Sequence, residues 1–182
     1  VAEEDGGGSV SDNPLADAAL VAELLGRHVQ PGPFVPMNVA LGSCSRHLAA
    51  ERRSALLPAA VAGEQVVAWA WADDHGGWDL GAGVTVEPSG AGHLLSGSRG
   101  NVAEAAQAGW LLVTATLEGE PVQVLVPTDA PGVTVEPLAA LDLARRFASV
   151  RLDAVEVPAD AVLRGGSDEL WRLHRQAAVL NA

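Results

Sequence analysis

The sequence contains no lysine, isoleucine or tyrosine, and its 182 residues include one cysteine, one methionine and two phenylalanines. The lone Cys44 excludes a disulfide within the chain. No apolar run approaches the roughly 20 residues that span a membrane, and the acidic start lacks the basic region of a signal peptide. We therefore expect a soluble, cytoplasmic protein with no part inserted in a membrane.

All eleven basic residues are arginine, and they face 23 acidic residues, which gives a net charge of -12. A nucleic-acid surface needs a basic face to displace counterions from phosphates, so this charge argues against a nucleic-acid partner. The hydrophobic share of 48% and the mean hydropathy of +0.19 fit a globular protein with a sizeable core.

The N-terminal third of the chain favours helices. Asn13 and Pro14 together make a helix start, because a capping side chain precedes a proline in the first turn, and Gly26 is a candidate end. After the proline-rich loop 31–33, Ser45 is expected to cap a second helix that Pro58 breaks or bends. The expected apolar residues are Leu20, Leu24 and Leu25 on the first helix and Leu48, Leu56 and Leu57 on the second.

From Val66 onward the apolar pattern alternates with a period of two, which predicts strands. Glu118, Gly119 and Glu120 form a hairpin turn between two of them. Seven short strands separated by turns favour a closed or nearly closed antiparallel barrel. The expected strands are Val66–Ala72, Gly83–Glu87, Gly92–Leu95, Trp110–Thr116, Val122–Val126, Val133–Glu136 and Ala148–Asp153. A last helix is predicted from Ser167, with apolar spacings of three and four at Leu170, Leu173, Ala177 and Leu180.

The stretch 68–79, AWAWADDHGGWD, joins an apolar strand to a polar turn, a place where functional sites often lie. It resembles a motif of the acyl-CoA dehydrogenase family that reads roughly Ala-Leu-Thr-Glu-Pro-x-Ala-Gly-Ser-Asp. In that family a Gly-Glu pair leads into the motif, as Gly63 and Glu64 do here.

Four further stretches resemble motifs of the same family, in the family's order. VAEEDGG at 1–7 is similar to Pro-Glu-Glu-x-Gly-Gly, and LVAELLGR at 20–27 is similar to a helix ending in Glu-Glu-Leu-Gly. HLLSGSR at 93–99 resembles Tyr-x-Leu-Asn-Gly-x-Lys, and VEVPAD at 155–160 resembles Val-x-Val-Pro-x-Asp. Since these matches span nearly the whole sequence, the chain is identified as a member of this family.

The resemblance implies an α+β, multi-domain fold. Residues 1–65 would be part of the N-terminal helical domain, 66–165 the middle β-barrel domain, and 166–182 the start of the C-terminal helical domain. In the family that last domain supplies the oligomer interface and the catalytic glutamate, and no residue here aligns with that base. We therefore expect these 182 residues to be part of a longer protein.

The resemblance also assigns site residues. In the family a threonine of the first motif holds the pyrimidine side of FAD, and here that position is Ala72, which follows Trp69 and Trp71. A second family motif, aromatic-Ile-Thr, packs on the flavin and reaches its N5 edge, and the matching positions are Asn101, Val102 and Ala103. The serine that contacts the CoA part of the substrate aligns with Trp78, which either blocks that space or stacks on a flat group.

Other readings of these residues stay open. Core packing explains Trp69 and Trp71 about as well as a flavin pocket does, and Trp110 and Trp171 are read as core or interface residues. Arg99, in place of the family lysine, could meet a phosphate or a carboxylate, and a surface ion pair is the preferred expectation. No metal site is predicted, because three adjacent residues of the turn 73–75 rarely converge on one ion.

Two functions follow from the resemblance. The first is an FAD-dependent acyl-CoA dehydrogenase, an oxidoreductase that introduces an α,β-double bond into an acyl-CoA thioester. The second is a non-catalytic partner subunit of a heteromeric acyl-CoA dehydrogenase, which binds flavin weakly or not at all. The replacements at Ala72, Asn101, Ala103 and Trp78 favour the second, and both predict a homo- or hetero-oligomer with another subunit of the family.

Overall fold

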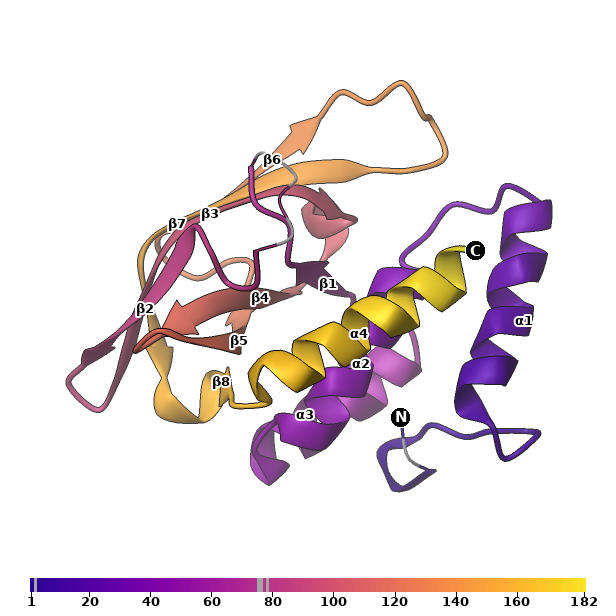
Figure 1. Cartoon of the computed structure of the whole chain (residues 1–182), viewed down its shortest axis with the longest axis horizontal. Coiled ribbons are helices and arrows are strands. Elements are labelled where there is room, and N and C mark those ends of the chain that lie inside the picture. The colour runs from indigo at the N-terminus through magenta and orange to yellow at the C-terminus, as the bar shows by residue number, and fades with distance from the viewer. Residues whose placement is uncertain (2, 75–76, 78) are drawn as a thin grey trace.

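The computed structural model describes residues 1, 3–74, 77 and 79–182. Helices lie beside a curved sheet, and α1 is the helix farthest from it (Figure 1). The α-helices are α1 (Pro14–Arg27), α2 (Phe34–His47), α3 (Ala50–Val61) and α4 (Gly166–Asn181), and the 3-10 helices are η1 (Glu3–Asp5), η2 (Ala105–Gln107) and η3 (Ala159–Ala161). The predicted first and last helices are thus confirmed.

Helix α1 begins where its sequence predicts, but the leucines expected on its buried face are largely exposed. The Asn13 side chain accepts a hydrogen bond from the Ala16 backbone N–H at 3.3 Å, and Pro14 opens the first turn. Leu20 and Leu24, expected to be buried, are 62% and 54% exposed. The side of α1 that contains Ala22 is the half-buried one, because small side chains let the helix approach its neighbours closely.

The second predicted helix is two helices in the structure. Ser45, expected to cap a helix, lies inside α2, whose Val39, Ala40 and Cys44 are fully buried. A helix buried on most sides lacks the polar face on which periodicity depends, so the pattern missed it. Pro58 lies inside α3, which continues for three more residues to Val61 and ends before Gly63, where φ is +78°.

The strands match the predicted ones in place and differ in length. The largest difference is at β3, where the residues 96–100 interrupt the apolar pattern but continue the strand through two register shifts. The short β8 was not predicted. The strands are β1 (Val67–Ala70), β2 (Val84–Ser89), β3 (Gly92–Ala103), β4 (Trp110–Leu117), β5 (Glu120–Pro127), β6 (Val133–Leu138), β7 (Phe147–Pro158) and β8 (Val162–Leu163).

The closed antiparallel barrel is not what the structure contains. Among the described strands the sheet runs β6-β7-β3-β2-β4-β5-β8, is open between β6 and β8, and is mixed. Both β1 and β2 run parallel to β4: β1 pairs with Trp110–Val113, and β2 pairs with Thr116 and Leu117. Alternation of residues carries no information on strand direction, so these parallel pairs could not be read from it. The β4–β5 hairpin is confirmed, with positive φ at Glu118 and Gly119.

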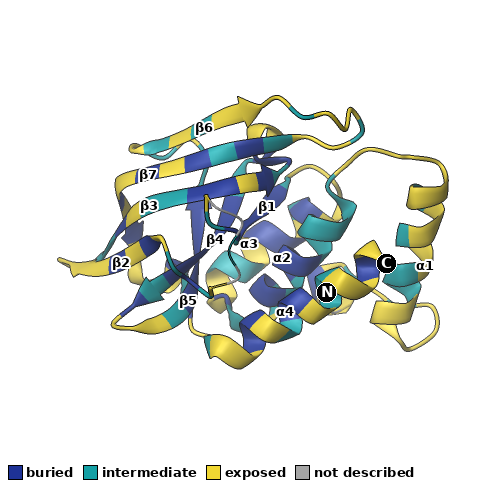
Figure 2. Cartoon of the chain, turned by 45° about the horizontal axis from the view of Figure 1, so that its top comes forward, coloured by how far each residue is buried: buried dark blue, intermediate teal, exposed yellow. Residues whose placement is uncertain are grey.

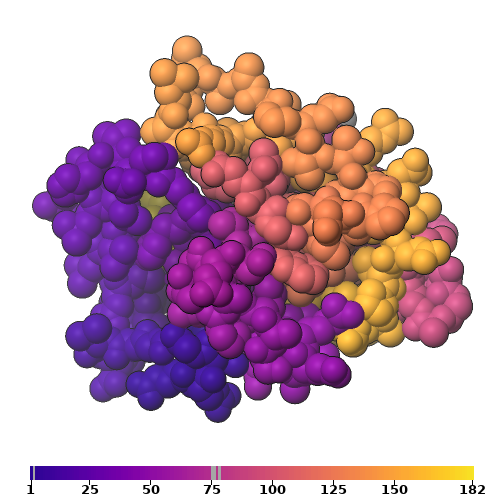
Figure 3. All heavy atoms as spheres, turned by 180° about the vertical axis from the view of Figure 1, so that it is seen from behind, coloured from indigo at the N-terminus to yellow at the C-terminus, as the bar shows by residue number. Residues whose placement is uncertain are grey.

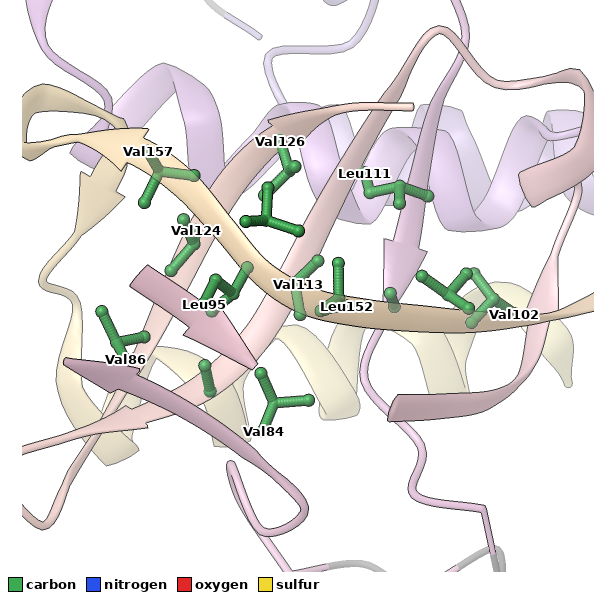
Figure 4. Close-up of a cluster of buried hydrophobic side chains, with 14 of the residues drawn as sticks. Val84, Val86, Leu95, Val102, Leu111, Val113, Val124, Val126, Leu152 and Val157 are labelled. Carbon is green, nitrogen blue, oxygen red and sulfur yellow. The ribbon is translucent and has the colours of Figure 1, made fainter. Parts of the chain in front are cut away.

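The sheet curls around an apolar core made by the inward residues of its strands. Figure 4 shows residues of β2, β3, β4, β5 and β7 pointing toward one another, among them Val84, Leu95, Val113, Val124 and Leu152. All five are at most 3% exposed. Burial of this apolar surface is the main source of stability for this half of the chain.

A second core lies between the helices and the outer face of the sheet. It contains Leu57 of α3, Leu112 of β4 and Leu173 of α4, all fully buried. Figure 2 shows α2 largely buried in this layer and α1 largely exposed beside it. From behind, in Figure 3, the N-terminal residues form one side of the molecule and the strand residues the other.

The buried thiol of Cys44 is part of this second core. Burial raises its pKa to about 12, so the thiol stays protonated at neutral pH and is a poor nucleophile. Within the described residues, no helix is long and apolar enough to cross a bilayer.

Candidate functional site

Strand β1 carries the first group of predicted site residues. Its alternation sends Ala68 and Ala70 into the sheet core and turns Trp69 toward the helices. Trp69 is 5% exposed, and Trp71, just beyond the strand end, is half-buried in the same layer. The two tryptophans therefore lie on one face, as the period of two predicts.

His174 of α4 closes this face. Its ring centroid lies 5.0 Å from that of Trp69 and 4.6 Å from that of Trp71, in edge-on geometries. The tryptophan ring centroids are themselves 5.4 Å apart. The His174 Nδ1 lies 2.7 Å from the Leu170 carbonyl oxygen and donates to it, which fixes the ring orientation. Sequence reasoning missed His174, although its spacing from Leu170 and Leu173 places it on the buried face of α4.

The second group of predicted residues lies at the end of β3, next to a register shift. The three residues separate there: Val102 enters the sheet core at 2% exposure, while Asn101 is exposed with φ at +49°. Ala103 is half-buried and lines a cavity of about 540 Å³. The structure thus does not bring these three side chains to one surface.

This cavity lies between α1, the end of β3, the segment 142–146 and the end of α4. Its wall is apolar along Leu25, Phe34 and Leu180, and its charged groups include the buried Glu104 and the exposed Arg145. The space can take an apolar group, but Ala103, which lines it, has no hydroxyl of the kind that the family motif would supply there.

The loop after β1 is fixed against the β3 strand. The Asp73 carboxylate accepts a hydrogen bond from the Gly77 N–H at 2.7 Å, and Ser98 donates to Asp74. At Gly100 a Cβ would lie 3.0 Å from the Asp74 Cα, so a larger residue would push the Asp74 backbone away by a few tenths of an ångström. Trp78, predicted to contact substrate, and His75 of the same turn lie outside the described residues.

Arg99 anchors the same region from inside, which corrects the prediction of a surface ion pair. Its side chain is fully buried, and its Nε donates to the Thr114 carbonyl at 3.0 Å while another guanidinium N–H donates to the Ala82 carbonyl. Burial lowers the pKa of Arg99 to about 10, although the Asp73 and Asp74 carboxylates act to raise it. The guanidinium therefore stays charged at neutral pH and ties β3 to β4 and to the segment before β2.

A polar groove of about 620 Å³ runs beside this loop, over β3, β6 and β7. Among the described residues that line it are the carboxylates of Asp74, Glu136 and Asp153, and Arg151 is the one cation in that described set. This excess of negative charge repels phosphates and so disfavours the phosphate-bearing part of CoA.

These observations test whether the residues fit FAD. Ala72 is 8% exposed and carries no hydrogen-bonding side chain, and Ala103 has none either. Val102 is in the sheet core, and Trp71 packs against His174. The side chains at the assigned positions therefore do not fit the flavin contacts that the resemblance implies.

The described residues contain no group of three or more His, Cys, Asp or Glu side chains placed to hold a metal ion.

The buried His174 makes stability depend on pH. Burial lowers its pKa below the usual value of 6.5, with the Leu170 hydrogen bond acting in the opposite direction. Below pH 6.5 the unfolded chain binds the proton more readily than the folded chain, so stability falls as pH falls through this range and is retained above it. Urea unfolding at about pH 5 and about pH 8 should show this loss. His174→Gln should reduce the difference, and an unchanged difference would contradict this assignment.

No protein-family model matches the chain, and no curated protein matches it in sequence. Among solved structures, a variant of the Tcur3481-Tcur3483 steroid ACAD is 30% identical with a TM-score of 0.84, covering 99% of this chain and 48% of that chain. The ChsE4-ChsE5 complex from Mycobacterium tuberculosis is 25% identical with a TM-score of 0.84, covering 96% of this chain and 46% of that chain.

A glutaryl-CoA dehydrogenase from Mycobacterium smegmatis, in complex with FADH2, is 24% identical with a TM-score of 0.71 and covers 76% of this chain and 37% of that chain. The chain thus spans about half or less of the length of the solved structures that it matches. The fold and its order of helices and strands are shared with these solved structures. The motifs at 68–79, 93–99 and 155–160 resemble those of the same family. The chain belongs to the acyl-CoA dehydrogenase family.

Proposed function

We propose that this chain is a subunit of an FAD-dependent acyl-CoA dehydrogenase, which oxidises an acyl-CoA thioester to its α,β-unsaturated product. The support is a fold shared over 99% of the chain with a steroid ACAD, at 30% identity. The same fold is shared with the ChsE4-ChsE5 complex, in which two differently named chains assemble. The proposed partner is accordingly a second, unlike subunit of the family.

Within this assembly we assign the chain the role of a non-catalytic partner subunit. The observation that carries this assignment is the state of the flavin-facing positions: Ala72 and Ala103 have no hydroxyl, and Val102 is buried in the sheet core. A side-chain hydrogen bond contributes on the order of 1 kcal/mol, so the loss of two weakens binding roughly ten- to a hundredfold. The FAD and the catalytic base would then be provided by the partner.

The acidic groove over β3, β6 and β7 supports the same role. A subunit that bound its own acyl-CoA would present cations to the CoA phosphates. Here Asp74, Glu136 and Asp153 outnumber Arg151 along the groove. The second candidate is a dehydrogenase that is complete in one protein, with its base further along the same chain. It is favoured by the fold shared with the FADH2 complex of glutaryl-CoA dehydrogenase.

Activity measured with and without a partner tests the proposal. The full-length protein should show no acyl-CoA oxidation when purified alone, and oxidation should appear when it is co-expressed and purified with an intact family subunit. The rate of acyl-CoA oxidation is measured by the reduction of an electron-accepting dye with a series of acyl-CoA thioesters. Turnover by the lone protein would instead establish the second candidate, and a purified complex that oxidises no thioester in the series would refute the proposed function.

A further inference from the structure

Three aromatic side chains are in contact next to Ala72, on the wall where the family resemblance places flavin. Trp69 and Trp71 come from the strand end of β1, and His174 comes from the middle of α4, about a hundred residues later. Trp69 and His174 are 5% and 8% exposed, so the cluster is part of the interior and not a surface patch.

The spacing of the three rings leaves no room for another ring between them. Their centroids are 5.4, 5.0 and 4.6 Å apart, which is direct contact for tilted and edge-on aromatic pairs. Because aromatic atoms approach no closer than about 3.5 Å, a planar ring inserted between two others needs about 7 Å. A flavin could enter only if Trp71 or His174 moved away.

The ring of His174 is held in place by α4 itself. The 2.7 Å hydrogen bond to the Leu170 carbonyl fixes the ring, and Leu170 and Leu173 anchor the helix in the second core at 1% and 0% exposure. At the start of α4, Glu169 accepts hydrogen bonds from Arg46 of α2 at 3.1 Å and from Arg172 at 2.6 Å. Moving His174 away would therefore mean moving a helix that is tied down at several points.

We propose that Trp69, Trp71 and His174 form an aromatic plug, which fills the assigned flavin wall with side chains of this chain and joins α4 to β1 without a cofactor. The proposal rests on the proposed function only where it identifies this wall as the one that faces flavin in the family. The plug's second role, holding α4, follows from the ring contacts alone. In this chain three rings in contact join α4 to the end of β1, and the packing of Leu170 and Leu173 in the second core adds to that attachment.

A gain-of-binding experiment tests the plug against flavin. FAD is titrated into the full-length protein and binding is followed by quenching of flavin fluorescence. The wild type should show no saturable quenching up to the highest FAD concentration used. A variant that opens the plug and restores both hydroxyls, Trp71→Leu with Ala72→Thr and Ala103→Thr, should bind with a dissociation constant at least about tenfold below that concentration. The matched control, Trp110→Leu with the same two threonines, should show no comparable gain, because Trp110 lies at the other end of the paired segment of β4.

Stoichiometric FAD binding by the wild type would overturn the plug, and so would an equal gain in the Trp110 control. If the opening variant fails to fold, circular dichroism of the wild type and of single tryptophan variants tests whether the Trp69 and Trp71 rings are in contact. Two indoles with centroids 5.4 Å apart should give an exciton couplet in the far ultraviolet. Trp69→Phe and Trp71→Phe should each abolish this couplet, whereas Trp110→Phe and Trp171→Phe should retain it.

Phenylalanine is a conservative replacement at position 69, because the Trp69 indole N–H makes no hydrogen bond with the described residues. A wild-type spectrum without the couplet, or a couplet that survives both substitutions, would show that the rings are not in contact and would overturn the proposal. These measurements need no acyl-CoA. An assembly without dehydrogenase activity would therefore refute the proposed function without contradicting the aromatic plug. A missing couplet would contradict the plug without bearing on the proposed function.

Discussion

Arg99→Leu is expected to lower the free energy of unfolding by about 2 to 4 kcal/mol. The substitution leaves the Thr114 and Ala82 carbonyls without their guanidinium donors, inside a part of the protein where the Arg99 side chain is fully buried. Each buried polar group that loses its partner costs about 1 to 3 kcal/mol. Urea denaturation followed by tryptophan fluorescence measures the loss.

Two variants make this prediction specific. Arg151→Leu, on the strand next to Arg99 but exposed, should change stability by no more than about 0.5 kcal/mol. Arg99→Lys keeps the charge but replaces the planar guanidinium fork, which spans the two carbonyls, with one compact ammonium group, so an intermediate loss is expected. Equal losses for Arg99→Leu and Arg151→Leu would show that the buried hydrogen bonds do not stabilise the fold.

Trp69→Ala is expected to destabilise the chain by about 3 to 5 kcal/mol. The substitution removes the largest side chain of β1 from the core between sheet and helices, where Trp69 is 5% exposed, and it leaves a cavity beside His174 and Leu112. The matched control is Trp171→Ala, since Trp171 is 42% exposed and also lies near His174, with ring centroids 5.8 Å apart. That change should cost about 1 kcal/mol.

Thermal or urea unfolding of both variants separates the two tryptophans. If Trp69→Ala costs no more than Trp171→Ala, then α4 is not packed on β1 as described. A large loss at Trp69 alone would agree with a buried ring, and the exciton couplet reports independently on the contact between Trp69 and Trp71.

Local signals predicted the start of α1, the face of α4 and the β4–β5 hairpin. Asn13 with Pro14, and Glu118 with Gly119, act through their own backbone and nearest neighbours, so their effect does not depend on the rest of the fold. The apolar spacing of α4 was also sufficient, because one face of that helix, including Leu173, is buried and the other is exposed.

Long-range pairing was not predictable in the same way. The parallel pairs that β1 and β2 make with β4 depend on how the chain returns across the sheet, and alternation does not encode it. Burial differs from the expectation in both directions: the charged Arg99 is inside and Leu20 is outside. The domain boundaries at 65 and 165 stay predictions.

The candidate site was predictable as a set of positions and not as an arrangement. The family motifs located Trp69, Trp71 and Ala72 together at one strand end, where they lie. The register shift before Val102 separates Asn101 from Ala103, and His174 joins the site from another element. Both effects come from tertiary packing, which a single sequence does not display.

The central claim is that this chain is an acyl-CoA dehydrogenase family subunit that does not itself hold flavin. The most direct test is the flavin content of the purified heteromeric complex, from the visible absorbance of flavin and the amounts of the two chains. We expect flavin in proportion to the intact partner alone, and a colourless protein when this chain is purified by itself. Flavin in proportion to both chains, or a yellow protein from this chain alone, would contradict it.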